Sequence, residues 1–440
     1  SSCSKLHRKP IHLLANLMRK GFNSLSPPSS ECCIYRVPQR LRSVNEKLCT
    51  PQAVSVGPLH QGKEGHKQRY LQDFIGRTNV ILEDFIKKIE DFIKKIKDHE
   101  ARLRRCYGEP IKFSSDEFVT IILVGAAFVI EPLLKDYFKF WDENDRIFDK
   151  PGMLQDVWTD MWLLENQLPF FILEDLFDPQ KITLPANADN NSITEGLSII
   201  SLSFSFFEHL LPVEKLEENL ETFRLVAHIV DLFRKIFKFY QPLESKAGGE
   251  LPSSIPSLTE LLLNTKPQQL QHAGVKFEAR QGENIFDIQF SSTNGVMKIP
   301  PFPLGFATKI MRNVLAFEQL HYPMSNDNYM SQYVSLVGGL VKTSGDVELL
   351  IDCILPTTSN EGRALIQYFY EGLLPLERQM LDASAGDEMN KYYSKRWNKW
   401  KAILRQNYFN TPWATISVIA AVVLLILSLI QTVASVVSAT

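Results

Sequence analysis

A long uncharged segment at the C-terminal end of the chain limits the possible folds more than any other feature. No charged side chain occurs from Gln406 to Thr440, and residues 414–437 read ATISVIAAVVLLILSLIQTVASVV. As an α-helix this stretch is about 36 Å long, compared with about 30 Å for the hydrocarbon core of a bilayer. Its β-branched residues do not argue against a helix, because in lipid only a helix satisfies every backbone N–H and C=O group locally. We therefore predict a single transmembrane helix over residues 414–437, inserted in the lipid bilayer.

The residues before this segment are basic and aromatic, as expected at a membrane surface. Six cations and no acidic residue occur between Lys391 and Arg405. No basic residue follows the apolar segment, so the positive-inside rule places its N-terminal side in the cytosol. Each cation near an anionic leaflet contributes about 1 kcal/mol, so residues 391–405 are predicted to bind anionic lipid headgroups. The predicted membrane-interface residues are Lys395, Arg396, Lys399, Lys401, Arg405 and Trp413.

Two other interpretations of the apolar segment are a buried core helix and a glycolipid-anchor signal. Core helices of this length seldom lack a charge. A glycolipid anchor requires an export signal at the front of the chain. The apolar patch there, Leu13-Leu14-Ala15, is much shorter than the core of a signal peptide. We expect a single-pass protein with its N-terminal bulk in the cytosol, in the plasma membrane because the span is generous.

The composition excludes several classes of protein. With 45% hydrophobic and 22% charged residues among 440, the chain is neither disordered nor fibrous. Its formal charge of −2 gives no electrostatic reason to bind nucleic acid. Six cysteines are too few for a disulfide scaffold, and in the cytosol they should be free thiols.

The remaining sequence predicts a mainly α fold: a large multi-helix domain with a small β-hairpin element and the C-terminal transmembrane helix. Predicted helices span about 66–106, 115–139, 155–177, 195–210, 214–240, 306–320, 329–342 and 361–406. Short alternating runs around Asn294-Gly295 predict the β element at 275–300. The predicted domains are a basic, Ser/Pro-rich mobile arm (1–31), an N-terminal helical lobe (32–243), a linker (244–256), a C-terminal helical lobe (257–407) and the anchor (408–440). Residues 34–60, rich in Pro and Gly, should be extended or turning.

A heptapeptide is duplicated within the first predicted helix: EDFIKKI occurs at Glu83–Ile89 and again at Glu90–Ile96. Seven residues make nearly two helical turns, so the second copy keeps the apolar stripe almost in phase. The duplication is interpreted as a lengthening of a packed helix. A coiled-coil contact is the alternative, but two repeats are fewer than the three or four that usually support one.

No metal or cofactor site is predicted. Cys32, Cys33 and Cys49 lack the paired spacing and the partner pair of a zinc site. His60 and His66 flank a polar, Gly-containing turn without a third ligand, so a solvated turn is the simpler interpretation.

The most unusual polar cluster lies between Asp160 and Phe171 (DMWLLENQLPFF). On a helix, its apolar residues would cover the buried side and leave Glu165 near the edge. Asp160 and Glu165 could form an acid–base pair in an enzyme. No nucleophile, histidine partner or cofactor motif accompanies them, so no catalytic residue is predicted. The simpler interpretation is that these polar groups are hydrogen-bonded to the backbone at a Pro-terminated helix.

Several of these segments resemble the plant family known as domain of unknown function 247, also called uncharacterised protein family 0481. The matching stretches are Ile34–Pro38 with Leu41-Arg42, Cys49–Pro51, Val54–Pro58, Leu163–Phe171, Ile255–Ser257, Ala273–Phe277, Asn313–Gln319, Tyr408–Phe409 and Pro412–Ala414. The most recognisable family signature contains Glu165, Asn166, Gln167 and Pro169, for which we expect a structural role. One departure is Gly125–Val129, where family members usually carry Asp-Gly-Cys-Phe-Ile before the matching Glu131.

The resemblance implies a single-pass plant membrane protein without an established enzymatic activity. Some members are associated with pollen self-incompatibility in grasses, which favours signalling or recognition over catalysis. The leading hypothesis is therefore a membrane-tethered helical platform for interaction or signalling, whose protein partners the sequence does not identify. The alternative is a membrane-tethered hydrolase or transferase that uses Asp160 and Glu165.

Overall fold

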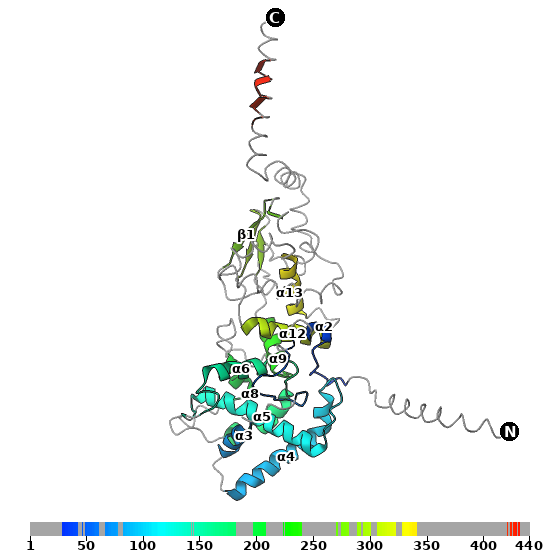
Figure 1. Ribbon diagram of the computed structural model, residues 1–440, viewed down its shortest axis with the longest axis vertical. Coiled ribbons are helices and arrows are strands. Elements are labelled where there is room, and N and C mark those ends of the chain that lie inside the picture. Colours follow the sequence, from blue (N-terminus) through cyan, green and yellow to red (C-terminus); the bar gives the residue numbers. More distant parts are fainter. Residues whose placement is uncertain are drawn as a thin grey trace, which may run out of the picture. The chain divides into compact units, whose positions relative to one another are not determined.

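The computed structural model shows a mainly helical protein with one small β-sheet (Figure 1). It describes residues 29–42, 46, 49–60, 67–77, 82–141, 143, 145–181, 197–207, 223, 225–239, 270–271, 274–280, 288–291, 294–300, 306–322, 328–340, 420, 423–424, 426–428 and 430–431. The chain divides into two compact units. The first comprises Ser1–Leu211, Lys215–Lys235 and Lys309–Pro323, and the second Pro212–Glu214, Ile236–Thr308 and Met324–Thr440.

The predicted domain boundaries stay a prediction. The linker 244–256 and most of the arm 1–31 lie outside the described residues, as does the predicted helix 361–406. Lys309–Pro323 follows that linker in sequence but belongs to the first unit. The Pro- and Gly-rich residues 34–60 are extended or turning where they are described, as predicted, apart from the short helix α2 (Gln39–Arg42).

Helix α5 (Ser115–Phe138) forms the core of the first unit, and the prediction of a helix at 115–139 is confirmed. It begins with a capping box in which Ser114 Oγ accepts a hydrogen bond from the Glu117 N–H, and the Glu117 carboxylate accepts one from the Ser114 N–H. It ends at Lys139, which adopts a left-handed conformation (φ 49°). Helices α3 (Lys67–Gly76), α4 (Leu82–Arg105), α7 (Phe170–Leu176) and α8 (Ile199–Phe207) all contact it.

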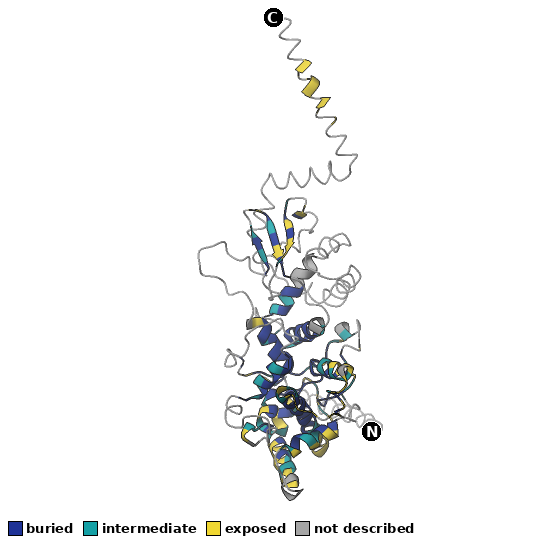
Figure 2. Cartoon of the chain, turned by 90° about the vertical axis from the view of Figure 1, so that its left-hand side faces the viewer, coloured by how far each residue is buried: buried dark blue, intermediate teal, exposed yellow. Residues whose placement is uncertain are grey.

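Among the described residues, α5 is the one helix long and apolar enough to cross a membrane. Most of its apolar stretch is buried within the protein, as expected for a core helix. The structure does not establish the predicted span 414–437 as a transmembrane helix, because most of that range lies outside the described residues. Those that are described, between 420 and 431, are helical and exposed (Figure 2).

The prediction of one continuous helix at 66–106 is wrong. Helix α3 ends at Gly76, Arg77 forms a turn, and α4 begins at Leu82, so both helices can pack on α5. Phe74 of α3 stacks on Phe92 of α4, with ring centroids 5.7 Å apart. The periodic apolar stripe is present, but it serves two helices instead of one.

The two copies of the duplicated heptapeptide differ in burial. Both lie in α4, where Phe92 and Ile96 of the second copy are buried, whereas Ile86 of the first copy is 55% exposed. The second copy therefore packs as predicted for a lengthened core helix. No described contact covers Ile86, so the coiled-coil alternative stays untested.

The prediction of one helix at 155–177 is also wrong. Helix α6 (Pro151–Met161) ends before the signature, α7 begins at Phe170, and the residues between them form a buried turn. Pro169 has no N–H group and marks the start of α7. The turn is the centre of the candidate site described below.

Helix α8 agrees with the prediction at 195–210, whereas α9 (Ile229–Phe239) is shorter than the predicted 214–240, since residues 225–228 are not helical. Asp231 accepts a hydrogen bond from the Ala227 N–H (3.0 Å), which satisfies a backbone donor at the start of α9. Trp162, Phe207 and Phe233 pack edge to face or tilted, with centroids 5.2–6.3 Å apart, and join the signature turn to both helices.

The β element of the second unit is a three-stranded sheet with the order β1-β3-β2. Strands β2 (Gln289–Ser291) and β3 (Val296–Ile299) form the predicted antiparallel hairpin, and Gly295 takes the positive φ of 68° that the turn requires. Strand β1 (Lys276–Ala279) adds in parallel to β3. Helices α12 (Phe306–His321) and α13 (Tyr329–Leu340) agree with the predictions at 306–320 and 329–342.

Candidate functional site

The signature turn, residues 162–169, is held by the side chains of its own polar residues. The Asn166 amide donates to the carbonyl oxygens of Asp160 and Val54, each at 3.0 Å. Its Oδ1 accepts hydrogen bonds from the N–H groups of Val56 (2.6 Å) and Gly57 (3.4 Å). Asn166 is 1% exposed, so a single buried amide joins the end of α6 to the N-terminal segment, residues 34–60.

Gln167 closes the turn from the other side. Its amide donates to the carbonyl oxygens of Met161 and Leu163, both at 2.8 Å, and the Met161 carbonyl lies at the end of α6. The Gln167 carbonyl accepts a hydrogen bond from the Tyr107 hydroxyl at 3.2 Å. These bonds replace the helical pattern that the apolar spacing alone would predict.

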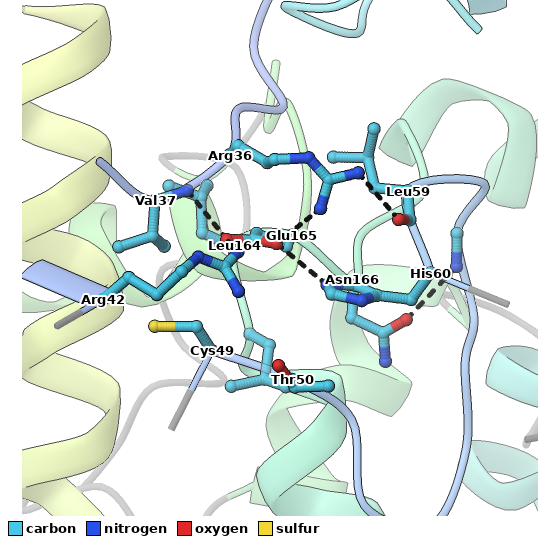
Figure 3. A network of polar contacts seen from close by, with 12 residues as sticks. Arg36, Val37, Arg42, Cys49, Thr50, Leu59, His60, Leu164, Glu165 and Asn166 are labelled. Atoms are coloured by element: carbon cyan, nitrogen blue, oxygen red, sulfur yellow. Dashed lines mark hydrogen bonds and ion pairs between the residues drawn. The ribbon is translucent and has the colours of Figure 1, made fainter. Parts of the chain in front are cut away.

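Glu165 lies fully buried at the centre of a cationic shell (Figure 3). Its Oε1 accepts hydrogen bonds from the Val37 N–H at 2.9 Å and from the Arg42 guanidinium. Its Oε2 lies 3.2 Å from Arg36 Nη1 and 2.9 Å from His60 Nε2. Both carboxylate oxygens are therefore occupied by donors from the N-terminal segment.

The electrostatic balance at Glu165 favours the ionised carboxylate. Burial alone raises the pKa of this carboxyl group, but hydrogen bonds from His60, the Val37 N–H and Arg42 outweigh burial and hold the pKa below its ordinary value. Arg42 is only 13% exposed, so solvent screens its ion pair weakly. Arg36 is 42% exposed and also pairs with Glu109, so it contributes less to the stability of the buried charge.

Asp160 anchors a second stretch of the N-terminal segment. Its carboxylate accepts hydrogen bonds from three consecutive N–H groups, those of Gln52 (2.8 Å), Ala53 (2.6 Å) and Val54 (2.8 Å). Burial raises the pKa of Asp160, and the three N–H donors oppose that rise. Asp160 thus acts as a buried acceptor for a segment that has no strand partner.

Two glycines allow the N-terminal segment to approach the core closely. A Cβ atom at Gly57 would lie 2.5 Å from the Gln167 carbonyl oxygen, and one at Gly125 would lie 2.2 Å from the Val56 carbonyl oxygen. Both distances are too short for any side chain, so glycine is required at each position by the backbone that faces it.

A separate charged cluster links α3 to α5. Arg77 Nε donates to both oxygens of the buried Glu131, at 2.8 and 2.7 Å. Lys135 pairs with Asp73 (2.7 Å) and Asp145 (2.8 Å); these ion pairs outweigh the effect of burial and raise the pKa of Lys135. Each of these buried charges has a partner, as a structural role requires.

Sequence reasoning placed the signature residues together but missed their partners. Arg36 and Arg42 belong to the N-terminal motif, where their spacing gave no indication of a target more than 120 residues away. His60, interpreted as part of a solvated turn, is 12% exposed and faces Glu165. Asn313 of α12, in another family motif, accepts a hydrogen bond from the Leu164 N–H at 2.9 Å.

The described cysteines are free and buried, and no group of described His, Cys, Asp or Glu residues is arranged to hold a metal ion. Cys49 lies apart from Cys32 and Cys33, next to the Arg312 guanidinium (3.6 Å), whereas Cys33 lies next to Cys106. His66 and the predicted membrane-interface residues Lys395, Arg396, Lys399, Lys401, Arg405 and Trp413 lie outside the described residues.

The geometry offers little for acid–base chemistry at Asp160 and Glu165. Both side chains are fully buried, and the oxygens of both already accept hydrogen bonds from the N-terminal segment. A general acid or base must reach a proton of the substrate, and neither carboxylate has a free oxygen on an exposed face. The arrangement is suited to fixing the N-terminal segment on the helical core.

Comparison with known proteins identifies the family. A family model described as a plant protein of unknown function, DUF247, matches residues 34–427. The chain belongs to the DUF247 family. The family match runs from the first residues of the N-terminal motif, through the signature turn, into the predicted anchor. The resemblance inferred from the motifs is therefore confirmed.

Two curated DUF247 relatives are proteins of Arabidopsis thaliana. UPF0481 protein At3g47200 is 27% identical over 443 aligned residues, which cover 94% of this chain and 88% of that protein. Putative UPF0481 protein At3g02645 is 23% identical over 485 aligned residues, which cover 90% of this chain and 89% of that protein. No solved structure matches the chain.

Proposed function

We propose that this protein is a single-pass, membrane-anchored interaction platform of the plant cell. Residues 414–437 cross the bilayer, residues 391–405 bind anionic headgroups, and the helical body presents a binding surface to protein partners in the cytosol. The plasma membrane is the proposed location, and signalling is the proposed process.

The observation that carries the anchor is the exposure of apolar helical side chains near the C-terminus. Val423, Leu424, Ile426, Leu427 and Ile430 are helical and between 49% and 66% exposed. Apolar side chains in such a group are unfavourable in water and favourable in a hydrocarbon environment. The absence of any charge from 406 to 440 supports the same placement.

The burial and bonding of the signature residues favour an interaction platform as the function, rather than an enzyme. Asp160, Glu165, Asn166 and Gln167 are buried and bonded to backbone or to neighbouring side chains of the first unit. Residues that are buried and bonded in this way are not available for a substrate. They fix the N-terminal segment on the helical core, and a rigid body of this kind is suited to binding a partner.

Extraction of membranes tests the anchor. Wild-type protein in plant microsomes should stay in the pellet at alkaline pH and leave it only with detergent. The double variant Leu424→Arg, Leu427→Arg should move to the soluble fraction, since each arginine at the centre of a span costs about 2.5–3.5 kcal/mol. Ile86→Arg places the same charge on an exposed apolar site of α4 and should leave the protein in the pellet. Wild-type protein in the soluble fraction would refute the anchor.

Topology and partners are tested on the same material. A tag at the N-terminus should be digested by protease in intact, cytosol-out vesicles, whereas a protected N-terminal tag would reverse the proposed topology. A biotin ligase fused to the N-terminus should label a reproducible set of membrane-proximal proteins, and the double arginine variant should lose that set. Identical labelling by both chains would contradict a membrane platform.

A further inference from the structure

Two cysteines that are far apart in sequence lie side by side in the first unit. The N–H groups of Cys33 and Ile34 both donate to the Cys106 carbonyl oxygen at 2.9 Å, and the Gly108 N–H donates to the Ile34 carbonyl at 2.8 Å. These bonds form a parallel β-bridge between Ile34 and Tyr107. Cys33 and Cys106 precede the two bridged residues, so they are neighbours across the bridge.

The spacing of this bridge suits a disulfide bond. Neighbouring strands lie about 4.8 Å apart, and disulfide-bonded cysteines have Cα atoms about 4.4–6.8 Å apart. Residues directly opposite each other in a parallel pair project their side chains to the same face, and each of the two thiols perturbs the pKa of the other. The side chains therefore point toward each other, and a bond between the sulfur atoms requires little movement of the backbone.

The surroundings of the two thiols shift their pKa values in opposite directions. The neighbouring Cys33 thiol lowers the pKa of Cys106 against the opposing effects of burial and of Glu31, and Arg102 and Arg105 favour the Cys106 thiolate. The Cys33 thiol has a raised pKa, because it lies beside the Cys106 sulfur and is buried. Cys106 is therefore the better nucleophile of the pair.

The other described cysteines are engaged elsewhere. The Cys32 side chain is hydrogen-bonded to Tyr35, whose hydroxyl also donates to the Cys32 carbonyl at 2.8 Å. Cys49 lies beside Arg312 in a different part of the unit. Of the four free cysteines in the described residues, Cys33 and Cys106 are the two that lie opposite each other across a backbone bridge.

We propose that Cys33 and Cys106 are a redox-sensitive pair that a peroxide converts to a reversible disulfide. The Cys106 thiolate attacks one oxygen of hydrogen peroxide, which breaks the O–O bond and, with the transfer of one proton, gives the sulfenic acid and one water. The Cys33 sulfur then attacks the Cys106 sulfur and displaces its hydroxyl group as a second water. Two thiols and one peroxide thus yield one disulfide and two waters. A thiol reductant restores both cysteines.

The disulfide would fix the N-terminal segment to the end of α4. Cys33 is three residues from Arg36 and four from Val37, which bind Glu165, so the link secures the same segment that the signature turn holds. Closing a loop of more than 70 residues restricts the unfolded chain strongly. Oxidation should therefore raise the thermal stability of the first unit without changing its fold.

Peptide mapping of the full-length protein in detergent tests this proposal. Reduced protein is treated with hydrogen peroxide, its remaining thiols are alkylated, and it is digested with trypsin. A disulfide between the peptides 21–36 and 106–112 is expected, with fragmentation that assigns the bond to Cys33, and dithiothreitol should remove it. Oxidation should raise the unfolding temperature of the wild type by about 5–10 °C. It should not raise that of Cys106→Ser.

Variants of the neighbouring cysteine provide the control. Cys32→Ser should keep the linked peptides, and Cys33→Ser should lose them. A link that persists in Cys33→Ser, a Cys32–Cys33 bond, or peroxide-treated wild type with no link would each overturn the proposal. The assignment in the wild type does not depend on whether Cys33→Ser folds, because fragmentation distinguishes the two adjacent cysteines.

Discussion

Replacing Glu165 by glutamine tests the structural role of the signature turn directly. The substitution keeps the shape of the side chain and one acceptor oxygen, but it removes the charge and turns the other oxygen into an N–H donor. If the remaining oxygen accepts from Val37 and Arg42, the new NH₂ group faces Arg36, which is itself a donor, and loses the charge that attracts both Arg36 and His60. Donors then face donors in a buried site.

The magnitude follows from the number and burial of the lost bonds. Two charge-assisted bonds are lost, each of which contributes about 1.5–3 kcal/mol. The bond to Arg36 counts for less, since that side chain is 42% exposed and keeps Glu109. Burying a neutral amide in place of a carboxylate offsets part of the loss. The expected net destabilisation is about 3 kcal/mol, or a fall in unfolding temperature of about 6–12 °C.

The assay is thermal unfolding of the full-length protein in detergent, with Glu109→Gln as the matched control. Glu109 pairs with the same Arg36 but is 42% exposed, so its substitution should change the unfolding temperature by at most a degree or two. Equal unfolding temperatures for the two variants would refute the reasoning. A Glu165→Gln variant that keeps its stability would also reopen the alternative of a catalytic carboxylate.

The pH dependence gives an independent check on Glu165. Since its pKa is lower in the folded protein than in the unfolded chain, the stability it contributes is present above the unfolded pKa. That stability is lost as the pH falls through the folded pKa. The difference in stability between wild type and Glu165→Gln should therefore shrink in acid, and a difference that grows in acid would contradict the sign of the shift.

Three further substitutions separate the other contributions. Asp160→Asn should lower the free energy of unfolding by about 2–3 kcal/mol, because the new amide group meets three N–H donors. The control Asp156→Asn, on the exposed side of α6, should change it by less than about 0.5 kcal/mol. Equal effects of the two substitutions in denaturant unfolding would argue against the acceptor role of Asp160. Gly125→Ala should cost about 1–3 kcal/mol despite its better helix propensity, because the new methyl group meets the Val56 carbonyl, whereas Gly152→Ala, with open space around it, should be neutral or stabilising. Burial lowers the pKa of His228 to about 4 from its ordinary 6.5, so the unfolded chain takes up a proton that the folded protein does not, and stability should fall by about 1.4 kcal/mol per pH unit below pH 6. His228→Gln should flatten that slope in denaturant titrations between pH 7 and 5, and an unchanged slope would contradict the assignment.

The parts of the fold that the sequence predicted are those whose signals are local. The helix predicted at 115–139 begins at Ser115, where Ser114 and Glu117, three residues apart, form a capping box. Asn294-Gly295 supplies a turn between two alternating runs, and the hairpin forms there. Each signal needs only neighbouring residues, so its interpretation does not depend on the rest of the chain.

The signature turn was predicted as helix because its decisive bonds are distant. Trp158, Met161, Leu164 and Leu168 have helical spacing, and all contribute to the core, though Trp158 is only partly buried. The helix nevertheless ends at Met161, and the side chains of Asn166 and Gln167 bond the backbone groups of the turn that follows. The other hydrogen-bond partners of Asn166 are backbone groups in Val54–Gly57. Periodicity reports which residues are buried, but it does not report where the partner of a polar side chain lies.

The candidate site was also not predictable from local patterns, because its polar side chains bond to the N-terminal segment, which is distant in sequence. Residues 52–57 are largely buried and have no strand or helix to pair with, yet buried N–H groups require acceptors. Asp160 accepts from residues 52, 53 and 54, and Asn166 accepts from residues 56 and 57. Glu165 does the same for Val37 while it neutralises Arg42. Three polar side chains thus replace a neighbouring strand, so their polarity in a buried turn is explained by the backbone they satisfy, and no substrate is needed to account for it.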